Sequence, residues 1–282
     1  MLKNHQKILN IKKKSKKQLI KQGYEIVKNM KNTYKKLSVI EKELLYKYKN
    51  TYYNIIRNYI IHGGVSYTDI INSINKNRRD SVNIGLLYNN FITEIENNIT
   101  LLDNIIKKNG ITKKINVYRG IYATDNKQYF LTKIHNISKK KGNILDIETF
   151  QSTTLDIYTS EDFIKYTSKK GIILEIETNG FPYIYLPWNI GKEPINKELL
   201  YNSEFELLLP KNLQMEYVCK KKIYIDKINI QNWRNYKKKG DVNFIETYIY
   251  TFRIIGYFTP KEKKKQDFLS IPVDDINTLY LM

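Results

Sequence analysis

Two stretches in the first half of the chain carry apolar residues at helical spacing. The first follows Ser38 and Glu41, which are spaced like the N-cap and third residue of a capping box. Its apolar positions recur every three or four residues up to Gly63-Gly64, at Leu44, Leu45, Tyr48, Tyr52, Ile55, Ile56 and Tyr59. The second stretch stops at Asn109-Gly110, after Ile92, Ile95, Ile99, Leu102 and Ile106. The spacing predicts two helices, in which we interpret the tyrosines as core and rim residues.

From residue 115 the pattern changes from helical to alternating, which is typical of strands. A short helix is predicted at 161–169, and strands are predicted at 115–122, 171–178, 205–210, 215–230 and 244–258. Asn179-Gly180 is a turn signal directly after one of these strands. Because helices come first and strands follow, the order predicts an α+β fold and argues against a repeated βαβ unit.

The charge of the chain is strongly positive, at +20 from 48 basic and 28 acidic side chains. Such an excess can indicate a nucleic-acid or other anionic partner, and the run Lys12–Lys17 fits a nuclear-import or polyanion-binding patch. The lysines are spread along the whole length, however, and Lys, Ile, Asn and Tyr dominate the composition, as an AT-rich coding sequence would produce. Dispersed charge of this kind favours solvated surfaces over a dedicated binding face.

Cysteine and histidine usage gives no sign of a disulfide or a metal site. Cys219 is the single cysteine, and the three histidines, His5, His62 and His135, are far apart in the sequence. The N-terminus lacks the apolar segment of a secretory signal, and no window has the ~20 apolar residues of a membrane span. We therefore expect a soluble protein that acts inside a cell, its own or a host into which it is delivered.

Arg119 is the first of three chemical landmarks in the strand-rich half. It alternates with Val117 and Ile115, so it shares the face on which apolar residues lie. The chain has only six arginines and uses lysine elsewhere, so an inward arginine is informative. Its planar fork binds phosphate or carboxylate through two bonds, although a structural ion pair would also explain it.

The second landmark is a run of hydroxyls, and the third is a pair of acids. Ser152, Thr153 and Thr154 follow Phe150 and can orient a carboxylate or a ligand amide, although such runs also form turns. Glu204 and Glu206 are two residues apart where an apolar strand begins, so they would share one face. Other Glu-x-Glu pairs lie on helices or on an ordinary solvent face, so context alone distinguishes this pair.

The order of these landmarks resembles the Arg/Ser/Glu class of mono-ADP-ribosyltransferases, which includes the clostridial binary toxins and exoenzyme-type domains. The resemblance runs from about Leu37 to about Tyr217 and includes the helix before Gly63, the approach to Arg119 and the stretch Ser203–Pro210. It implies a helical lobe at 36–110 packed on a mixed two-sheet β core at 111–260. Residues 1–35 would then be a basic extension and 261–282 a tail.

The resemblance also implies residue roles for an NAD substrate, with no metal. Arg119, next to Gly120, would hold the NAD diphosphate. Ser152, with Thr153 beside it, would position the catalytic acid, and Thr154 stands where the family usually has a second Ser. Phe163 would stack on nicotinamide.

The two acids would have separate roles. Glu206 would be the catalytic residue at the nicotinamide ribose, while Glu204 and Tyr201 would engage an arginine of a protein acceptor. Two alternatives remain open: an NAD glycohydrolase that uses the same site on water, and a non-enzymatic nucleic-acid-binding protein. The enzyme itself requires neither nucleic acid nor a membrane span.

Overall fold

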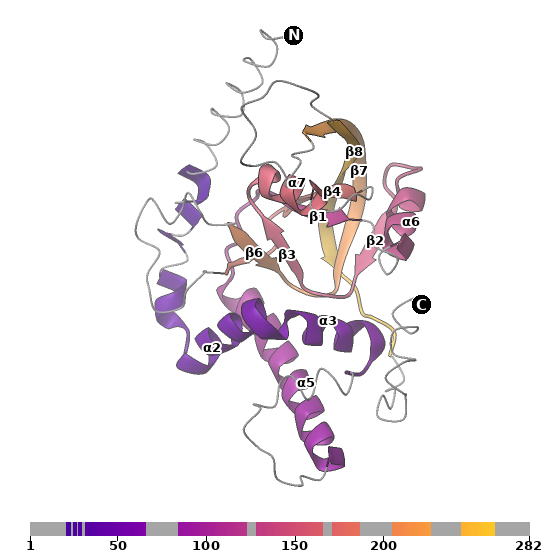
Figure 1. Cartoon of the computed structure of the whole chain (residues 1–282). Coiled ribbons are helices and arrows are strands. Elements are labelled where there is room, and N and C mark those ends of the chain that lie inside the picture. Colours follow the sequence, from indigo (N-terminus) through magenta and orange to yellow (C-terminus); the bar gives the residue numbers. More distant parts are fainter. Residues whose placement is uncertain are drawn as a thin grey trace, which may run out of the picture.

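The structure, a computed structural model, describes residues 21–23, 25–26, 28–29, 32–65, 84–122, 128–165, 171–186, 205–226 and 244–262. The run Lys12–Lys17 and residues 263–282 of the predicted tail lie outside this part of the chain. Helices precede most of the strands, so the α+β class is confirmed (Figure 1).

The first predicted helix is confirmed, with a change of pitch in its middle. The Ser38 amide donates to Glu41 Oε2 at 2.7 Å and the Glu41 amide donates to Ser38 Oγ at 3.2 Å, as in a capping box. The helix ends at Gly63, whose φ of 74° is left-handed and suits glycine. Between these ends the helical segments are α2 (Val39–Lys47), the π-helical turn η1 (Tyr48–Tyr52) and α3 (Tyr53–His62).

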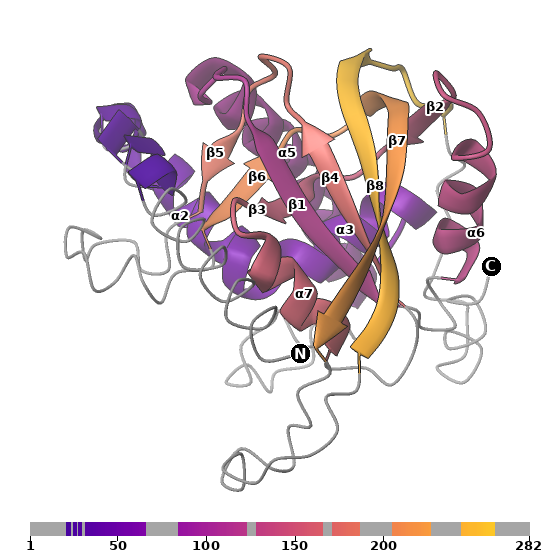
Figure 2. The same cartoon turned by 90° about the horizontal axis from the view of Figure 1, so that it is seen from above.

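The second predicted helix is α5 (Ile84–Asn109), which is longer than its apolar stripe suggested. Two shorter helices, α6 (Gln128–Ile137) and α7 (Ile157–Lys165), lie between strands. Helix α7 begins four residues before the predicted helix at 161–169. In Figure 2, α7 lies on one side of the sheet, and α3 and α5 lie on the other.

The described strands form one eight-stranded sheet in the order β2-β7-β8-β4-β1-β3-β6-β5. Their bounds are β1 (Asn116–Tyr122), β2 (Ile144–Ile147), β3 (Gln151–Thr154), β4 (Gly171–Glu177), β5 (Ile184–Tyr185), β6 (Glu206–Leu209), β7 (Leu213–Asp226) and β8 (Phe244–Tyr257). Only β4 and β8 run parallel among these neighbours. Strand β1 meets β3 at the single pair Tyr118–Thr154, so the two-sheet division is not confirmed, and the sheet is narrowly connected at this point.

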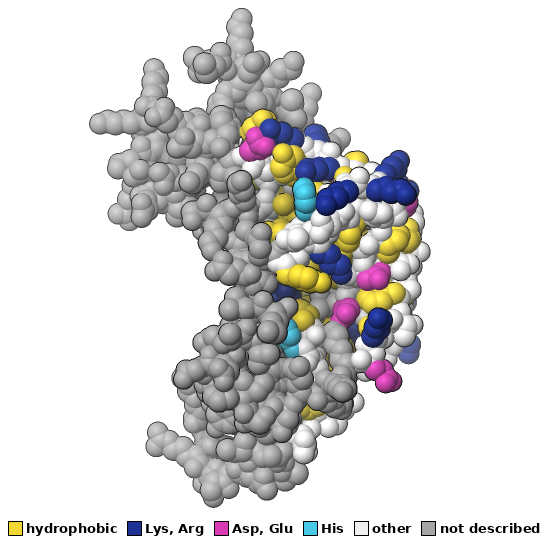
Figure 3. Space-filling view, turned by 90° about the vertical axis from the view of Figure 1, so that its right-hand side faces the viewer, with side chains coloured by type: hydrophobic (Ala, Val, Ile, Leu, Met, Phe, Trp, Pro, Cys, Tyr) yellow, Lys and Arg dark blue, Asp and Glu magenta, His cyan; other side chains and the backbone are white. Residues whose placement is uncertain are grey.

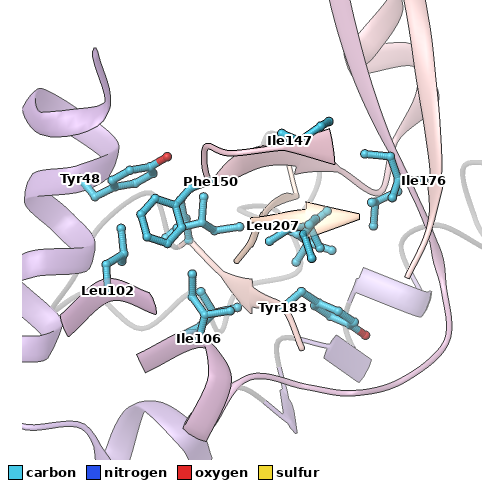
Figure 4. Packing of buried hydrophobic residues seen from close by; sticks show 14 of the residues in the cluster. Tyr48, Leu102, Ile106, Ile147, Phe150, Ile176, Tyr183 and Leu207 are labelled. Carbon is cyan, nitrogen blue, oxygen red and sulfur yellow. The ribbon is translucent and has the colours of Figure 1, made fainter. Parts of the chain in front are cut away.

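A hydrophobic core joins the helices to one face of the sheet (Figure 4). Tyr48 and Leu102 come from the helical segments, while Phe150 and Leu207 come from β3 and β6 or their ends. All four side chains are at most 2% exposed. A buried face shared by η1, α5, β3 and β6 holds these elements in register, which matters because the candidate site lies where they meet.

Replacing Leu102 with Ala should lower the free energy of unfolding by about 2–5 kcal/mol, because the substitution leaves a cavity in this core. Urea denaturation of the full chain measures the loss. Leu101→Ala is the matched control, since Leu101 is only partly buried beside it. An equal loss for the two variants would contradict the placement of Leu102 between helix and sheet.

Positive charge on the face drawn in Figure 3 is dispersed. Lys and Arg side chains of the described residues lie there at several separate positions, with hydrophobic and uncharged groups between them. No helix in the described ranges has the length and apolar character that a membrane crossing requires. The same residues contain no group of three His, Cys, Asp or Glu placed to hold a metal ion.

Candidate active site

Strands β3 and β6 bring the predicted serine and the second predicted acid together. Their antiparallel register pairs Ser152 with Leu208 and Thr154 with Glu206, so Ser152 and Glu206 are diagonal neighbours on one face. The Ser152 hydroxyl donates a hydrogen bond to Glu206 Oε1. The carboxylate is therefore held in a defined orientation by a residue of the adjacent strand.

Arg119 reaches the same place from β1. One guanidinium nitrogen donates to the Ser152 carbonyl at 2.8 Å, and the other donates to the Tyr53 hydroxyl at 2.9 Å. Burial lowers the pKa of Arg119, but its interactions with Tyr53 and Glu206, among others, raise the pKa overall above its ordinary value. The guanidinium thus remains a permanent positive charge at the junction of β1, β3 and α3.

Lys49 supplies a second cation, from the π-helical turn η1. Its Nζ lies 2.9 Å from Glu206 Oε2, and the two side chains are only 12% and 16% exposed. The same ammonium group donates to the Leu186 carbonyl at 3.4 Å, just after β5. Both carboxylate oxygens of Glu206 are therefore engaged, one by a hydroxyl and one by an ammonium group.

These contacts close a ring that joins the helical segments to the sheet. Lys49 forms an ion pair with Glu206, and Glu206 accepts a hydrogen bond from the Ser152 hydroxyl. Arg119 donates to the Ser152 carbonyl and to the Tyr53 hydroxyl. Tyr53 lies four residues after Lys49, near the junction of η1 and α3. The ring places one acid between two cations, so groups of both signs lie where the helical segments meet the sheet.

Aromatic residues support the ring from the core side. Tyr48 packs edge-on against Tyr53 and against Phe150, with ring centroids 5.9 Å apart in both pairs. Burial raises the pKa of Tyr48 well above its usual value, and Tyr53 adds to this shift, so the hydroxyl stays protonated. Phe150 immediately precedes β3. Its contact with Tyr48 therefore ties the start of β3, which carries Ser152, to the helical segment η1.

The backbone turns sharply just before Glu206. Phe205 has a φ of 44°, a left-handed conformation that is unusual for a bulky residue and is often found beside functional sites. The Glu206 carbonyl then accepts a hydrogen bond from the Leu186 amide at 2.9 Å. The first residue of β6 is therefore held by its backbone as well as by its side chain.

Three other residues named in the resemblance lie next to the ring without joining it. The Thr153 hydroxyl is buried and donates to the Leu207 carbonyl at 2.9 Å, so it secures β3 to β6 from the other face. Gly120 follows Arg119 on β1 and pairs with Ile173 of β4. The Thr154 hydroxyl accepts from the Asp156 amide at 3.0 Å, so the hydroxyl at this position helps to turn the chain after β3.

The remaining candidates are outside the described side chains. Phe163 lies on α7, and its side chain is not described. Tyr201 and Glu204 precede the described residues of β6. The first acid of the pair and the aromatic before it therefore remain predictions from the sequence.

Lys49 and Tyr53 are site residues that the sequence reasoning missed. The sequence pattern predicts that the tyrosines of the first helix are core and rim residues and that the lysines lie on solvated surface. The sequence contains one hint. Lys49 directly follows Tyr48, which lies on the predicted inner face of the helix, so Lys49 lies close to that face. Periodicity identifies a face, but it does not show which strand residue lies opposite.

Solved structures share this fold. No protein-family model matches the sequence, and no curated protein matches it. The enzymatic component C2-I of the C2 toxin of Clostridium botulinum, at pH 3.0, is 15% identical with a TM-score of 0.52. The same component at pH 6.1 is also 15% identical, with a TM-score of 0.50 over 82% of this chain and 47% of that chain. The ADP-ribosylating toxin BECa of C. perfringens, solved with NADH, is 18% identical with a TM-score of 0.49, over 82% and 46%.

The match to C2-I covers 84% of this chain and 48% of that chain, so the chain spans about half the length of the toxin component. The likeness concerns the fold. The chain therefore has the fold of the matched half of C2-I, a toxin component, which agrees with the resemblance in its sequence.

Proposed function

We propose that the chain is an NAD-dependent mono-ADP-ribosyltransferase that moves ADP-ribose from NAD to an arginine of a protein acceptor and releases nicotinamide. The observation that carries this proposal is the convergence of Arg119, Ser152 and Glu206, which are far apart in the sequence, in one ring of contacts. The toxin-like fold and the resemblance in the sequence support it independently.

The reaction explains why a lone carboxylate suffices at the bond that breaks. Nicotinamide leaves NAD as a neutral ring and takes the electrons of the glycosidic bond, so no acid has to protonate it. Positive charge then develops on the ribose, as in other glycosyl transfers. Glu206, oriented by Ser152, would stabilise that charge, and Arg119 would hold the diphosphate.

The acceptor step needs a second acid. A guanidinium nitrogen attacks the ribose carbon that nicotinamide has left, and one proton must leave the guanidinium as the new bond forms. Free guanidinium stays protonated at neutral pH and is a poor nucleophile. Glu204 would orient the group and accept the proton, with Tyr201 packed against the arginine side chain.

The direct test is incubation of the full chain with NAD that is labelled in its adenylate part, with poly-arginine or poly-lysine as acceptor. Label on poly-arginine, together with free nicotinamide, is the expected result. Nicotinamide release without protein labelling would replace the transferase with an NAD glycohydrolase. A folded chain that releases no nicotinamide would contradict both.

Replacing Glu204 with Gln should lower arginine labelling at least tenfold, because the amide cannot take the proton from the acceptor. Nicotinamide release should continue, since Glu206 and Ser152 are unchanged. The two products are measured in the same reaction, and Glu43→Gln on α2 serves as a control for a change of one charge. Normal labelling of arginine by the Glu204 variant would show that the assigned role is wrong.

A further inference from the structure

The ion pair between Lys49 and Glu206 has no role in the proposed reaction. Glu206 has to present negative charge to the ribose, yet Lys49 Nζ sits 2.9 Å from the carboxylate oxygen that Ser152 leaves available. Both side chains are at least five-sixths buried. In such a place water screens the ammonium group poorly, so it opposes the stabilisation that the carboxylate should provide.

A buried ammonium group that loses its counterion is costly even where a carbonyl still accepts from it, so another anion would favour the release of Lys49 from Glu206. The other described cation of the ring is Arg119, which could hold such an anion. Arg119 is joined to Glu206 through Ser152 on one side and to Tyr53 on the other, and Tyr53 lies one helical turn from Lys49. A diphosphate held by Arg119 would thus lie beside the segment that carries Lys49.

The backbone around Lys49 fits a residue that changes partners. It lies in the π-helical turn η1, and wide turns of this kind occur frequently at functional sites. Its four-carbon stem is flexible and its ammonium group binds as a point charge, whereas the planar Arg119 fork donates in two fixed directions, to the Ser152 carbonyl and to the Tyr53 hydroxyl. Lys49 can therefore move while Arg119 keeps its place.

We propose that Lys49 is an exchangeable counterion of the catalytic carboxylate. Without substrate, its ammonium group neutralises Glu206. When NAD binds, it transfers to the diphosphate beside Arg119 and leaves the carboxylate free to face the nicotinamide ribose. Substrate binding and exposure of the acid are thereby coupled. This inference rests on the proposed function, because it assumes that the diphosphate of NAD enters this ring.

Equilibrium binding of ADP tests the exchange without any turnover. ADP carries the diphosphate but has no bond to nicotinamide, and adenosine serves as the ligand without phosphates. Isothermal titration calorimetry is carried out on the full chain with wild type, Glu206→Gln, Lys49→Met and the double variant. Glu206→Gln should bind ADP several-fold more tightly than wild type, because Lys49 no longer has a competing anion.

In the Glu206→Gln background, Lys49→Met should weaken ADP binding about tenfold or more, which corresponds to about 1.4 kcal/mol per tenfold. Lys49→Arg should retain most of the affinity. Adenosine should bind all variants alike. Lys47→Met is the matched control, since it removes a positive charge from an exposed position two residues away.

Equal ADP affinity with and without Lys49 would overturn the inference, as would a failure of Glu206→Gln to tighten binding. If Lys49→Met does not fold, as judged by circular dichroism, the comparison of wild type with Glu206→Gln still decides. Nicotinamide release by wild type is measured separately. Release of nicotinamide together with failed ADP predictions rejects the exchange alone, whereas absence of release rejects the proposed function.

Discussion

Replacing Glu206 with Gln is expected to lower nicotinamide release by about 10²–10³-fold or more, because a preorganised charge at the reacting ribose is lost. The amide has nearly the same shape, and its oxygen can still accept the hydrogen bond from Ser152. What disappears is the negative charge between Lys49 and Arg119. Both transfer to arginine and hydrolysis of NAD should fall together, since they share the step in which nicotinamide leaves.

The measurement is nicotinamide release and protein labelling from the same reaction. Glu246→Gln is the matched control, because Glu246 is also a strand glutamate that pairs with a lysine, Lys222, at 2.7 Å. That pair is half-exposed on β7 and β8, so its loss should leave activity unchanged. A Glu206 variant that keeps more than a tenth of the wild-type rate would show that another group stabilises the transition state.

Much of the site follows from local pattern and context in the sequence. Alternation along β1 placed Arg119 on the inward face, and its neighbour Val117 is fully buried. The turn before an apolar strand selected Glu206 among several Glu-x-Glu pairs. Ser152 was singled out by its hydroxyl neighbours and by the order of the landmarks. These features depend on residues close in sequence, where side-chain period is informative.

The contacts between distant segments were not predictable in the same way. The helical period could place Tyr53 on an inner face, but the hydrogen bond to Arg119 joins residues 66 positions apart. The Lys49 ammonium group reaches Glu206 from the π-helical turn η1, between α2 and α3. A π-helical turn leaves no clear mark in a pattern of apolar positions. Lys49 therefore looked like one more solvated lysine in a lysine-rich chain.

Short elements were missed for a related reason. Strand β5 is the pair Ile184–Tyr185, and β2 and β3 have four residues each, which is too short for alternation to stand out. The two-sheet expectation came from the resemblance. The single pair that joins β1 to β3 is a tertiary detail that the sequence does not encode locally.

Replacing Arg119 with Lys is the second change for which we expect a large effect, a fall in kcat/KM for NAD of about 10²-fold or more. The guanidinium donates in two directions, to the Ser152 carbonyl and to the Tyr53 hydroxyl. Hydrogen bonds to charged groups contribute about 1.5–3 kcal/mol each, and a lysine cannot form both with the same geometry. The positive charge is conserved in this variant, so the fall in kcat/KM would report the contribution of the two guanidinium hydrogen bonds.

Steady-state kinetics over a range of NAD concentrations separates the two roles that Arg119 could have. A ligand of the diphosphate binds NAD before the reaction, so its loss should appear mainly as a higher KM. Arg253→Lys is the matched control, since Arg253 on β8 contacts Glu177 and is 40% exposed. Its replacement should change neither constant.

A different outcome would reassign the residue. If kcat fell while KM for NAD stayed the same, Arg119 would act through Ser152, whose carbonyl it holds and whose hydroxyl orients Glu206. The diphosphate would then need another cation, and Lys49 is the candidate that the ring of contacts provides. If neither kcat nor KM for NAD changed, the contacts of the ring would only stabilise the packing of the helical segments on the sheet. The convergence of its residues would then no longer support an NAD site.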